Sequence, residues 1–293
     1  MSTLRRHRKN IWINEIDDLI RGACGGFLFG IPLLYTMEVW WIGSIVTPPM
    51  MLAAIASTFI IVFLLNRTAG FRKAENIKAS DALIDTVEAI AIGVICTALL
   101  LVLLQEINGQ TPLDEAVGKL IYESMPFTLG VALANQFLSG DPNQEEKSSS
   151  QKGPKSRKQA DLNATLSDIG GTLIGSIFIA FNIAPTDEVV MLAAAISAPW
   201  LLMIIAASLL ISYGIVFEAG FANQKKRMQQ KGIFQRPLSE TVMSYLVSLL
   251  AAAIMLFFFH QLTFDDPWSL WLRYSLVLGL PSTIGGAAGR LAV

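Results

Sequence analysis

The chain has 293 residues, of which 53% are hydrophobic and only 15% are charged, and its formal net charge is −1. A soluble domain carries about a quarter charged residues, so this composition excludes an ordinary soluble enzyme and also a disordered chain. The near-neutral charge provides no basic field for binding nucleic acid. The two cysteines lie far apart in apolar runs and form no CxxC motif, which predicts neither a disulfide framework nor a thiolate metal site. The composition is typical of a polytopic membrane protein.

Apolar segments long enough to cross a bilayer recur along the chain. A helix needs about 20 mostly apolar residues to cross, and eight segments satisfy this requirement: 19–38, 49–66, 83–107, 116–138, 165–184, 199–219, 240–262 and 268–290. Two further apolar stretches, 39–47 and 189–197, are too short to cross. Each could form a re-entrant loop, an interfacial helix or an extension of a neighbouring helix. The sequence therefore predicts an all-α membrane protein with eight transmembrane helices.

Basic residues indicate how these helices are oriented. If the N-terminus lies in the cytoplasm, 20 of the 22 lysines and arginines fall on the cytoplasmic side, and only Lys119 and Arg273 fall on the other side. Cytoplasmic loops carry such an excess of basic residues. We therefore expect a multi-pass protein of the inner (plasma) membrane with both termini in the cytoplasm. Four tryptophans near the predicted outer ends suit an interfacial aromatic belt: Trp40, Trp41, Trp268 and Trp271.

The sequence matches itself when it is shifted by 150 residues, and by 155 residues after an insertion in the second cytoplasmic loop. Matching pairs include Asp18 with Asp168, Gly25 with Gly175, Pro49 with Pro199, Pro126 with Pro281 and Thr128 with Thr283. Because each half holds an even number of spans, the halves enter from the same side, and their axis should run along the membrane normal. We predict two parallel-oriented four-helix repeats, 18–138 and 165–293. A basic N-terminal segment, 1–17, precedes them and a polar cytoplasmic linker, 139–164, joins them.

The last span of each predicted repeat contains a proline followed by a threonine and a glycine. The two copies are Pro126-x-Thr128-x-Gly130 and Pro281-x-Thr283-x-Gly285. Proline kinks a helix and frees a backbone carbonyl, and interrupted helices at matching positions of two repeats point to a transport site. The alternative is a plain kink, with each threonine bonded back to its own helix.

Carboxylates inside the predicted spans are the other candidates for chemistry. Glu123 lies inside the fourth span, where an ionised side chain must face a cavity or a partner. Its repeat mate is Leu278, so this charge breaks the pseudo-symmetry. Glu88 lies deep in the third span. It could line a cation path or have a structural role, and the sequence favours neither interpretation.

Four further carboxylates have a simpler explanation. Asp85 and its repeat mate Glu240 lie near the starts of their spans, as do the mates Asp18 and Asp168. Acidic side chains are favourable at helix N-termini, where the helix dipole and free N–H groups attract them. Capping is therefore the preferred interpretation for all four, and ion binding is the alternative.

Glycines spaced four residues apart occur in three of the predicted spans: Gly22, Gly26 and Gly30; Gly171 and Gly175; Gly285 and Gly289. Small residues at this spacing let helix backbones approach closely. This spacing favours packing inside the bundle, and a homo-oligomer contact through the glycine-rich faces is the alternative.

Three features of the chain recur in a known group of proteins. They are the D-x6-G opening, the AGF triplet that closes the second span and the P-x-T-x-G motif in the last span. With these features the chain resembles a family of uncharacterised bacterial integral membrane proteins, from Asp17 to Arg290. The resemblance implies a bacterial inner membrane and supplies no catalytic residues.

The sequence contains no HExxH, GxSxG, P-loop or GxGxxG motif, so we predict no enzyme, no cofactor and no metal site. The favoured function is a transporter or channel for a small cation, with proton coupling as an option, whose path lies where the repeats meet. The two glutamates, Glu88 and Glu123, would bind the ion or proton, the proline breaks would supply carbonyls and the threonines hydroxyls. The alternative is a non-transporting membrane scaffold, assembly factor or sensor.

Overall fold

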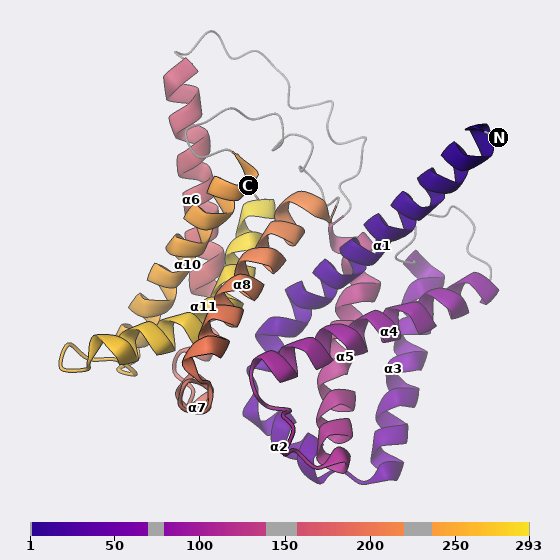
Figure 1. The fold of residues 1–293 in the computed structure, drawn as a ribbon, viewed down its shortest axis with the longest axis horizontal. Coiled ribbons are helices and arrows are strands. Elements are labelled where there is room, and N and C mark those ends of the chain that lie inside the picture. Colours follow the sequence, from indigo (N-terminus) through magenta and orange to yellow (C-terminus); the bar gives the residue numbers. More distant parts are fainter. Residues whose placement is uncertain (1, 70–78, 139–156, 220–235, 293) are drawn as a thin grey trace. The chain divides into compact units, whose positions relative to one another are not determined.

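The computed structural model describes residues 2–69, 79–138, 157–219 and 236–292, and every regular element in these ranges is a helix (Figure 1). The chain divides into two compact units. Unit 1 comprises Met1–Val102 and Ile107–Leu138, with Glu218–Gly220, and unit 2 comprises Leu103–Glu106, Ser139–Phe217 and Phe221–Val293. Most of the predicted linker, 139–164, lies outside the described residues.

Unit 1 is built around its last helix. Its helices are α1 (Ser2–Leu34), α2 (Met37–Ile45), α3 (Pro48–Ala69), α4 (Ala79–Leu103) and α5 (Leu113–Leu138). α5 packs against α1, α2 and α3, and Gly93 of α4 lies directly against the backbone of Thr128 on α5. α5 is therefore the helix that the other four surround.

Unit 2 is likewise organised around its last helix. Its elements are α6 (Arg157–Ile183), α7 (Glu188–Ala195), α8 (Ala198–Tyr213), the π-helix η2 (Gly214–Glu218), α10 (Pro237–Phe258) and α11 (Trp268–Ala292). α11 packs against α6, α7, α8 and α10, and residues 275–287 of α11 are all buried.

Length and composition identify fewer crossing helices than the eight predicted. Five described segments are long and apolar enough to cross a membrane: Pro48–Arg67, Ala79–Leu103, Thr165–Ile183, Ala198–Glu218 and Pro237–Phe258. A sixth crossing arises if α1 and α2, which are bent by 90° at their junction, count as one span. α5 and α11, which hold the predicted spans 116–138 and 268–290, are long enough but too polar to qualify. Both are central helices, and a helix shielded from lipid by its neighbours can carry polar residues.

The two short apolar stretches, 39–47 and 189–197, form the helices α2 and α7. The 90° bend between α1 and α2 excludes a straight extension of α1. A re-entrant segment and an interfacial helix remain the two interpretations of α2.

The glycine stripes lie in contacts inside each unit. In unit 1, a Cβ atom at Gly22 or Gly26 of α1 would lie 3.2 Å from the side chain of Val131 on α5, and Gly30 faces the ring of Phe127. In unit 2, Gly175 of α6 meets the carbonyl of Gly285 on α11. α5 therefore lies against the stripe of α1, and the stripes of α6 and α11 lie against each other.

Candidate functional site

The most deeply buried acidic side chain lies on the central helix of unit 1. Glu123 stands near the middle of α5 and is fully buried. Phe127 and Gly130, four and seven residues further along α5, both contact α1. Residues at these spacings share one face of a helix, so Glu123 lies on the side of α5 that faces α1.

The contacts between α1 and α5 also set the level of Glu123. Gly25 meets Gly130 and Gly30 meets Phe127, so the two helices run antiparallel. Continuing this sequence places Glu123 beside Leu34, at the end of α1, where the chain bends by 90° into α2. The last carbonyls of a helix have no intrahelical partner and carry the negative end of its dipole. A carboxylate at this level would lie near the negative end of the α1 dipole and one turn along α5 from the buried Lys119.

The two proline motifs differ in how their threonines are bonded. The hydroxyl of Thr283 donates to the carbonyl of Gly279 at 2.6 Å, as the plain-kink interpretation expects. The Thr128 hydroxyl is buried against α4 and has no hydrogen-bond partner among the described residues. Thr128 is about 140° around α5 from Glu123 at 3.6 residues per turn, so the two do not line one face. The motif copies therefore do not supply equivalent hydroxyls.

The acidic residues of α4 lie at different depths. Asp85 is buried and Glu88 is partly buried. Thr86, next to Asp85, accepts a hydrogen bond from the Asn66 amide of α3 at 3.2 Å and donates to the carbonyl of Ala82. A hydrogen bond between polar side chains thus connects the last part of α3 to the first part of α4.

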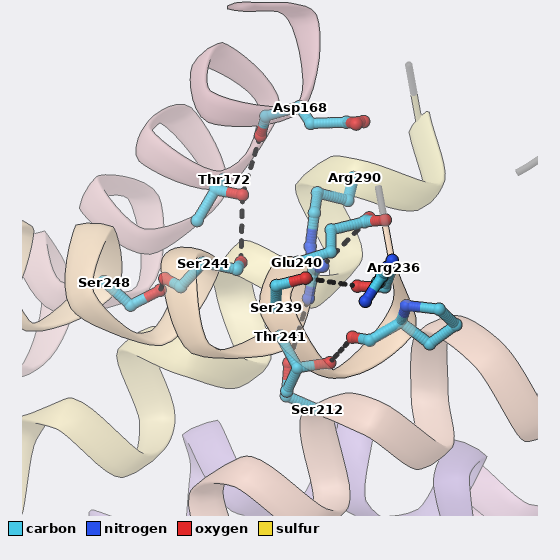
Figure 2. A network of polar contacts seen from close by, with 11 residues as sticks. Asp168, Thr172, Ser212, Arg236, Ser239, Glu240, Thr241, Ser244, Ser248 and Arg290 are labelled. Carbon is cyan, nitrogen blue, oxygen red and sulfur yellow. Dashed lines mark hydrogen bonds and ion pairs between the residues drawn. The ribbon is translucent and has the colours of Figure 1, made fainter. Parts of the chain in front are cut away.

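Unit 2 contains a buried ion pair (Figure 2). The guanidinium Nη1 of Arg290 on α11 lies 3.3 Å from Oε1 of Glu240 on α10, and Nη2 of Arg290 donates to the hydroxyl of Ser212 on α8 at 3.0 Å. Arg290 is fully buried and Glu240 is 3% exposed. The pair therefore fastens three helices of unit 2 to one another.

Two pairs of hydroxyl groups join α6 to α10 beside this ion pair. The hydroxyls of Thr172 and Ser244 lie 3.1 Å apart, as Figure 2 shows. One turn further along both helices, the hydroxyl of Ser176 donates to that of Ser248 at 2.8 Å. A Cβ atom at Gly286 of α11 would lie 2.7 Å from the Ser176 hydroxyl and 2.8 Å from the Ser248 hydroxyl. Three helices thus meet at Gly286 with no space for a methyl group.

We expect Gly286→Ala to destabilise the protein by about 1–3 kcal/mol, the usual cost of overpacking a filled interior. The cost should be smaller in a Ser176→Ala/Ser248→Ala background, because the two nearest oxygen atoms are then absent. Thermal unfolding in detergent, followed by circular dichroism, measures both effects. Gly170→Ala on α6 is the control, because a Cβ atom there meets nothing within 4 Å. An equal cost in both backgrounds would contradict this packing.

The capping interpretation is wrong for Asp18, Asp85 and Asp168. α1 begins at Ser2, α4 at Ala79 and α6 at Arg157, so all three residues lie inside their helices. Asp18 instead pairs with Arg21 at 3.0 Å. Asp168 is buried, and its backbone carbonyl accepts a hydrogen bond from the hydroxyl of Thr172.

The capping interpretation is incomplete for Glu240. The residue lies in the first turn of α10, as predicted, but the N-cap position is Arg236, without a side-chain cap bond. The carboxylate of Glu240 meets Arg290 instead, 50 residues later.

A family model described as "Putative integral membrane protein (DUF2391)" matches residues 18–293. The match covers every described helix, with α1 included from Asp18 onward. The chain belongs to the DUF2391 family of integral membrane proteins. The predicted resemblance to an uncharacterised membrane protein family is thereby confirmed. No curated protein and no solved structure matches the chain.

Reasoning from the sequence of this DUF2391 protein missed Arg290 as a functional or structural partner. A buried arginine must find a carboxylate, so its position inside the last span was a usable signal. Which carboxylate it meets depends on how α10 and α11 pack, and no local pattern encodes that. The prediction that the cation path lies where the repeats meet stays a prediction.

Proposed function

We propose that this DUF2391 protein moves a small cation or a proton across the bacterial inner membrane. The observation that carries the proposal is that Glu123, on the central helix α5, is fully buried. Extending the antiparallel contacts of α1 with α5 places it at the level where α1 breaks into α2. A buried intramembrane carboxylate is costly and marks ion or proton pathways. Helix breaks at the same depth are typical of transport sites, because free carbonyls at a helix C-terminus can bind a cation.

The proposal includes eight membrane crossings in two parallel four-helix repeats. α5 and α11 would be the two crossings that composition alone does not identify, since each is covered by neighbouring helices of its unit. In this arrangement α1 with α2, and α6 with α7, each contribute one crossing and one short apolar helix. Glu123 would then lie within the bilayer, out of contact with lipid.

Three pairs of structural features support the duplication. The order of one long helix, one short helix and three long helices occurs in both units. The two non-glycine residues with positive φ among those described, Gln105 at 64° and His260 at 61°, are 155 residues apart. The glycine contacts of α1 with α5 and of α6 with α11 also occur at repeat-equivalent positions.

A compensating exchange of side-chain volume also supports the duplication. In unit 1, Val131 of α5 packs against Gly22 and Gly26 of α1. At the equivalent positions of unit 2, α11 has Gly286 and α6 has the larger Thr172 and Ser176. In unit 1 the larger side chain is on the last helix, α5, whereas in unit 2 the larger side chains are on the first helix, α6. The first and last helices are in contact in both units.

Lys119 and Arg273 are the two basic residues that fall on the outer side when both termini lie in the cytoplasm. Their local contacts support this orientation. Lys119 pairs with Glu115 at 2.9 Å, and Arg273 donates to the Ile196 carbonyl at the end of α7. Each residue therefore has a structural use that offsets the usual bias against basic residues on the outer side.

Cation flux into proteoliposomes tests the proposed function. The purified protein is reconstituted, and uptake of monovalent and divalent cations is followed at two pH values, with a pH-sensitive dye reporting protons. We expect uptake of one cation class, or of protons, above that of protein-free liposomes. If correctly folded protein moves no cation and no protons, the proposal is wrong and the scaffold, assembly-factor or sensor alternative takes its place.

A further inference from the structure

A compact group of aromatic rings lies where α10 turns into α11, on the loop between the two helices and on the helix ends beside it. The ring centroid of Phe257 lies 4.7 Å from that of Phe264 and 6.0 Å from that of Trp271. Trp271 in turn lies 6.5 Å from Trp268 and 6.5 Å from Phe264. We call these four residues, with the turn 263–266 between them, the aromatic hairpin.

Hydrogen bonds inside the turn hold the aromatic hairpin in one conformation. The backbone N–H and the hydroxyl of Thr263 both donate to Oδ2 of Asp266, at 2.7 and 2.8 Å. The backbone N–H of Asp266 donates to the Thr263 carbonyl, and Nε1 of Trp271 donates to the same carbonyl at 3.1 Å. The rings are therefore presented by a preformed turn.

The outermost rings of the aromatic hairpin are left uncovered by the unit that carries them. Phe264 is 85% exposed and Trp268 is 87% exposed. Packing inside the unit covers only a small part of these two rings, and in water each would expose a large apolar surface.

The position of the aromatic hairpin along the chain indicates what covers these rings. α10, which ends at Phe258, is 22 residues long and apolar enough to cross a membrane. At 1.5 Å per residue it spans about 33 Å, close to the thickness of the hydrocarbon core. The residues that follow directly therefore lie at the boundary between lipid and water. Tryptophan, with its polar N–H, prefers that boundary, and phenylalanine is among the apolar side chains that bury into it.

We propose that the aromatic hairpin is a membrane anchor whose Phe264 and Trp268 rings insert at the headgroup–acyl boundary of a zwitterionic leaflet. The acidic Asp265 and Asp266 flank the inserted ring and disfavour anionic headgroups by like-charge repulsion. The anchor fixes the depth at which α10 and α11 sit in the bilayer. The proposal requires only that α10 crosses the membrane, and it is independent of cation transport.

The loop that joins α4 to α5 provides an internal comparison. Gln105 occupies the position of His260, and Gly109 occupies the position of Phe264, 155 residues earlier. The loop 104–112 contains no aromatic residue. A Cβ atom at Gly109 would meet nothing within 4 Å, so a label there disturbs nothing. We expect this loop to stay in water.

Spin labels at the two loops test the anchor. Phe264→Cys and Gly109→Cys variants are labelled and placed in phosphatidylcholine nanodiscs. Collision rates are then measured with oxygen, which partitions into lipid, and with a nickel chelate, which stays in water. We expect the label at 264 to collide several-fold more with oxygen than with the chelate, and the label at 109 to show the reverse. Unmutated protein gives the background of Cys24 and Cys96, both of which are buried.

Two outcomes would overturn the proposal. A label at 264 as accessible to the nickel chelate as the label at 109 would place the aromatic hairpin in water. A label at 264 shielded from both reagents would indicate a protein partner or a second copy of the chain. Quenching of tryptophan fluorescence by brominated phosphatidylcholine, reduced in Trp268→Phe, gives a second readout that leaves Phe264 in place.

Discussion

Glu123→Gln is expected to lower cation flux in proteoliposomes to the level of protein-free vesicles. Glutamine keeps the shape of the glutamate side chain but can neither release a proton nor neutralise a cation. Because Glu123 is fully buried beside the break between α1 and α2, no water-exposed carboxylate can take its place. The loss should occur without unfolding, since a neutral amide is cheaper to bury than an ionised carboxylate.

A second carboxylate on the same helix supplies the matched control. Glu115 lies two turns before Glu123 on α5, has a side chain that is 31% exposed, and pairs with Lys119. Glu115→Gln removes a charge of the same kind from the end of α5 and should leave flux near that of the unmutated protein. If Glu123→Gln retains full flux while it elutes as a folded species, Glu123 is not part of the pathway. Equal losses in both variants would indicate a general effect of charge on α5.

Arg290→Gln is expected to produce the largest loss of stability among single substitutions in unit 2. It leaves the carboxylate of Glu240 buried without the guanidinium that faces it at 3.3 Å. Breaking a buried ion pair from one side costs about 3–5 kcal/mol, since the remaining charge is neither hydrated nor neutralised. Thermal or denaturant unfolding in detergent, followed by circular dichroism, measures this loss.

The double variant Glu240→Gln/Arg290→Gln distinguishes an ion pair from simple packing. With both charges absent, no isolated charge remains buried, so the double variant should be more stable than Arg290→Gln alone. Ser212→Ala removes only one hydrogen bond to Arg290 and should cost about 1 kcal/mol. If the losses of stability measured for Glu240→Gln and for Arg290→Gln simply add in the double variant, the proposed coupling between Glu240 and Arg290 is wrong.

Local patterns along the sequence were sufficient to predict the class of protein and much of the helix order. The apolar lengths predicted α3, α4 and α10 closely, because the requirement to cross about 30 Å of hydrocarbon applies to each segment by itself. The resemblance carried by the motifs led to the correct family. The expectation that Glu123 faces a cavity or a partner stays a prediction, and the structure adds that its side chain is fully buried.

Helix starts were predicted less well, and that error changed the interpretation of several acids. Because α1 and α6 begin well before the apolar segments that identified them, Asp18 and Asp168 are interior residues and not caps. A polar, charged stretch can continue a helix into water, where hydropathy no longer marks its boundary.

The amino-acid sequence by itself determined that this is a helical membrane protein with an acidic residue in an apolar span, because hydropathy and charge belong to contiguous segments. Only the tertiary structure decided that α5 and α11 are the central helices, that Glu123 is fully buried, and that Glu240 pairs with Arg290. These relationships depend on the rotation and contact of helices far apart in the chain. The free energy of such contacts comes from packing and charge pairing across helices, which no single segment encodes.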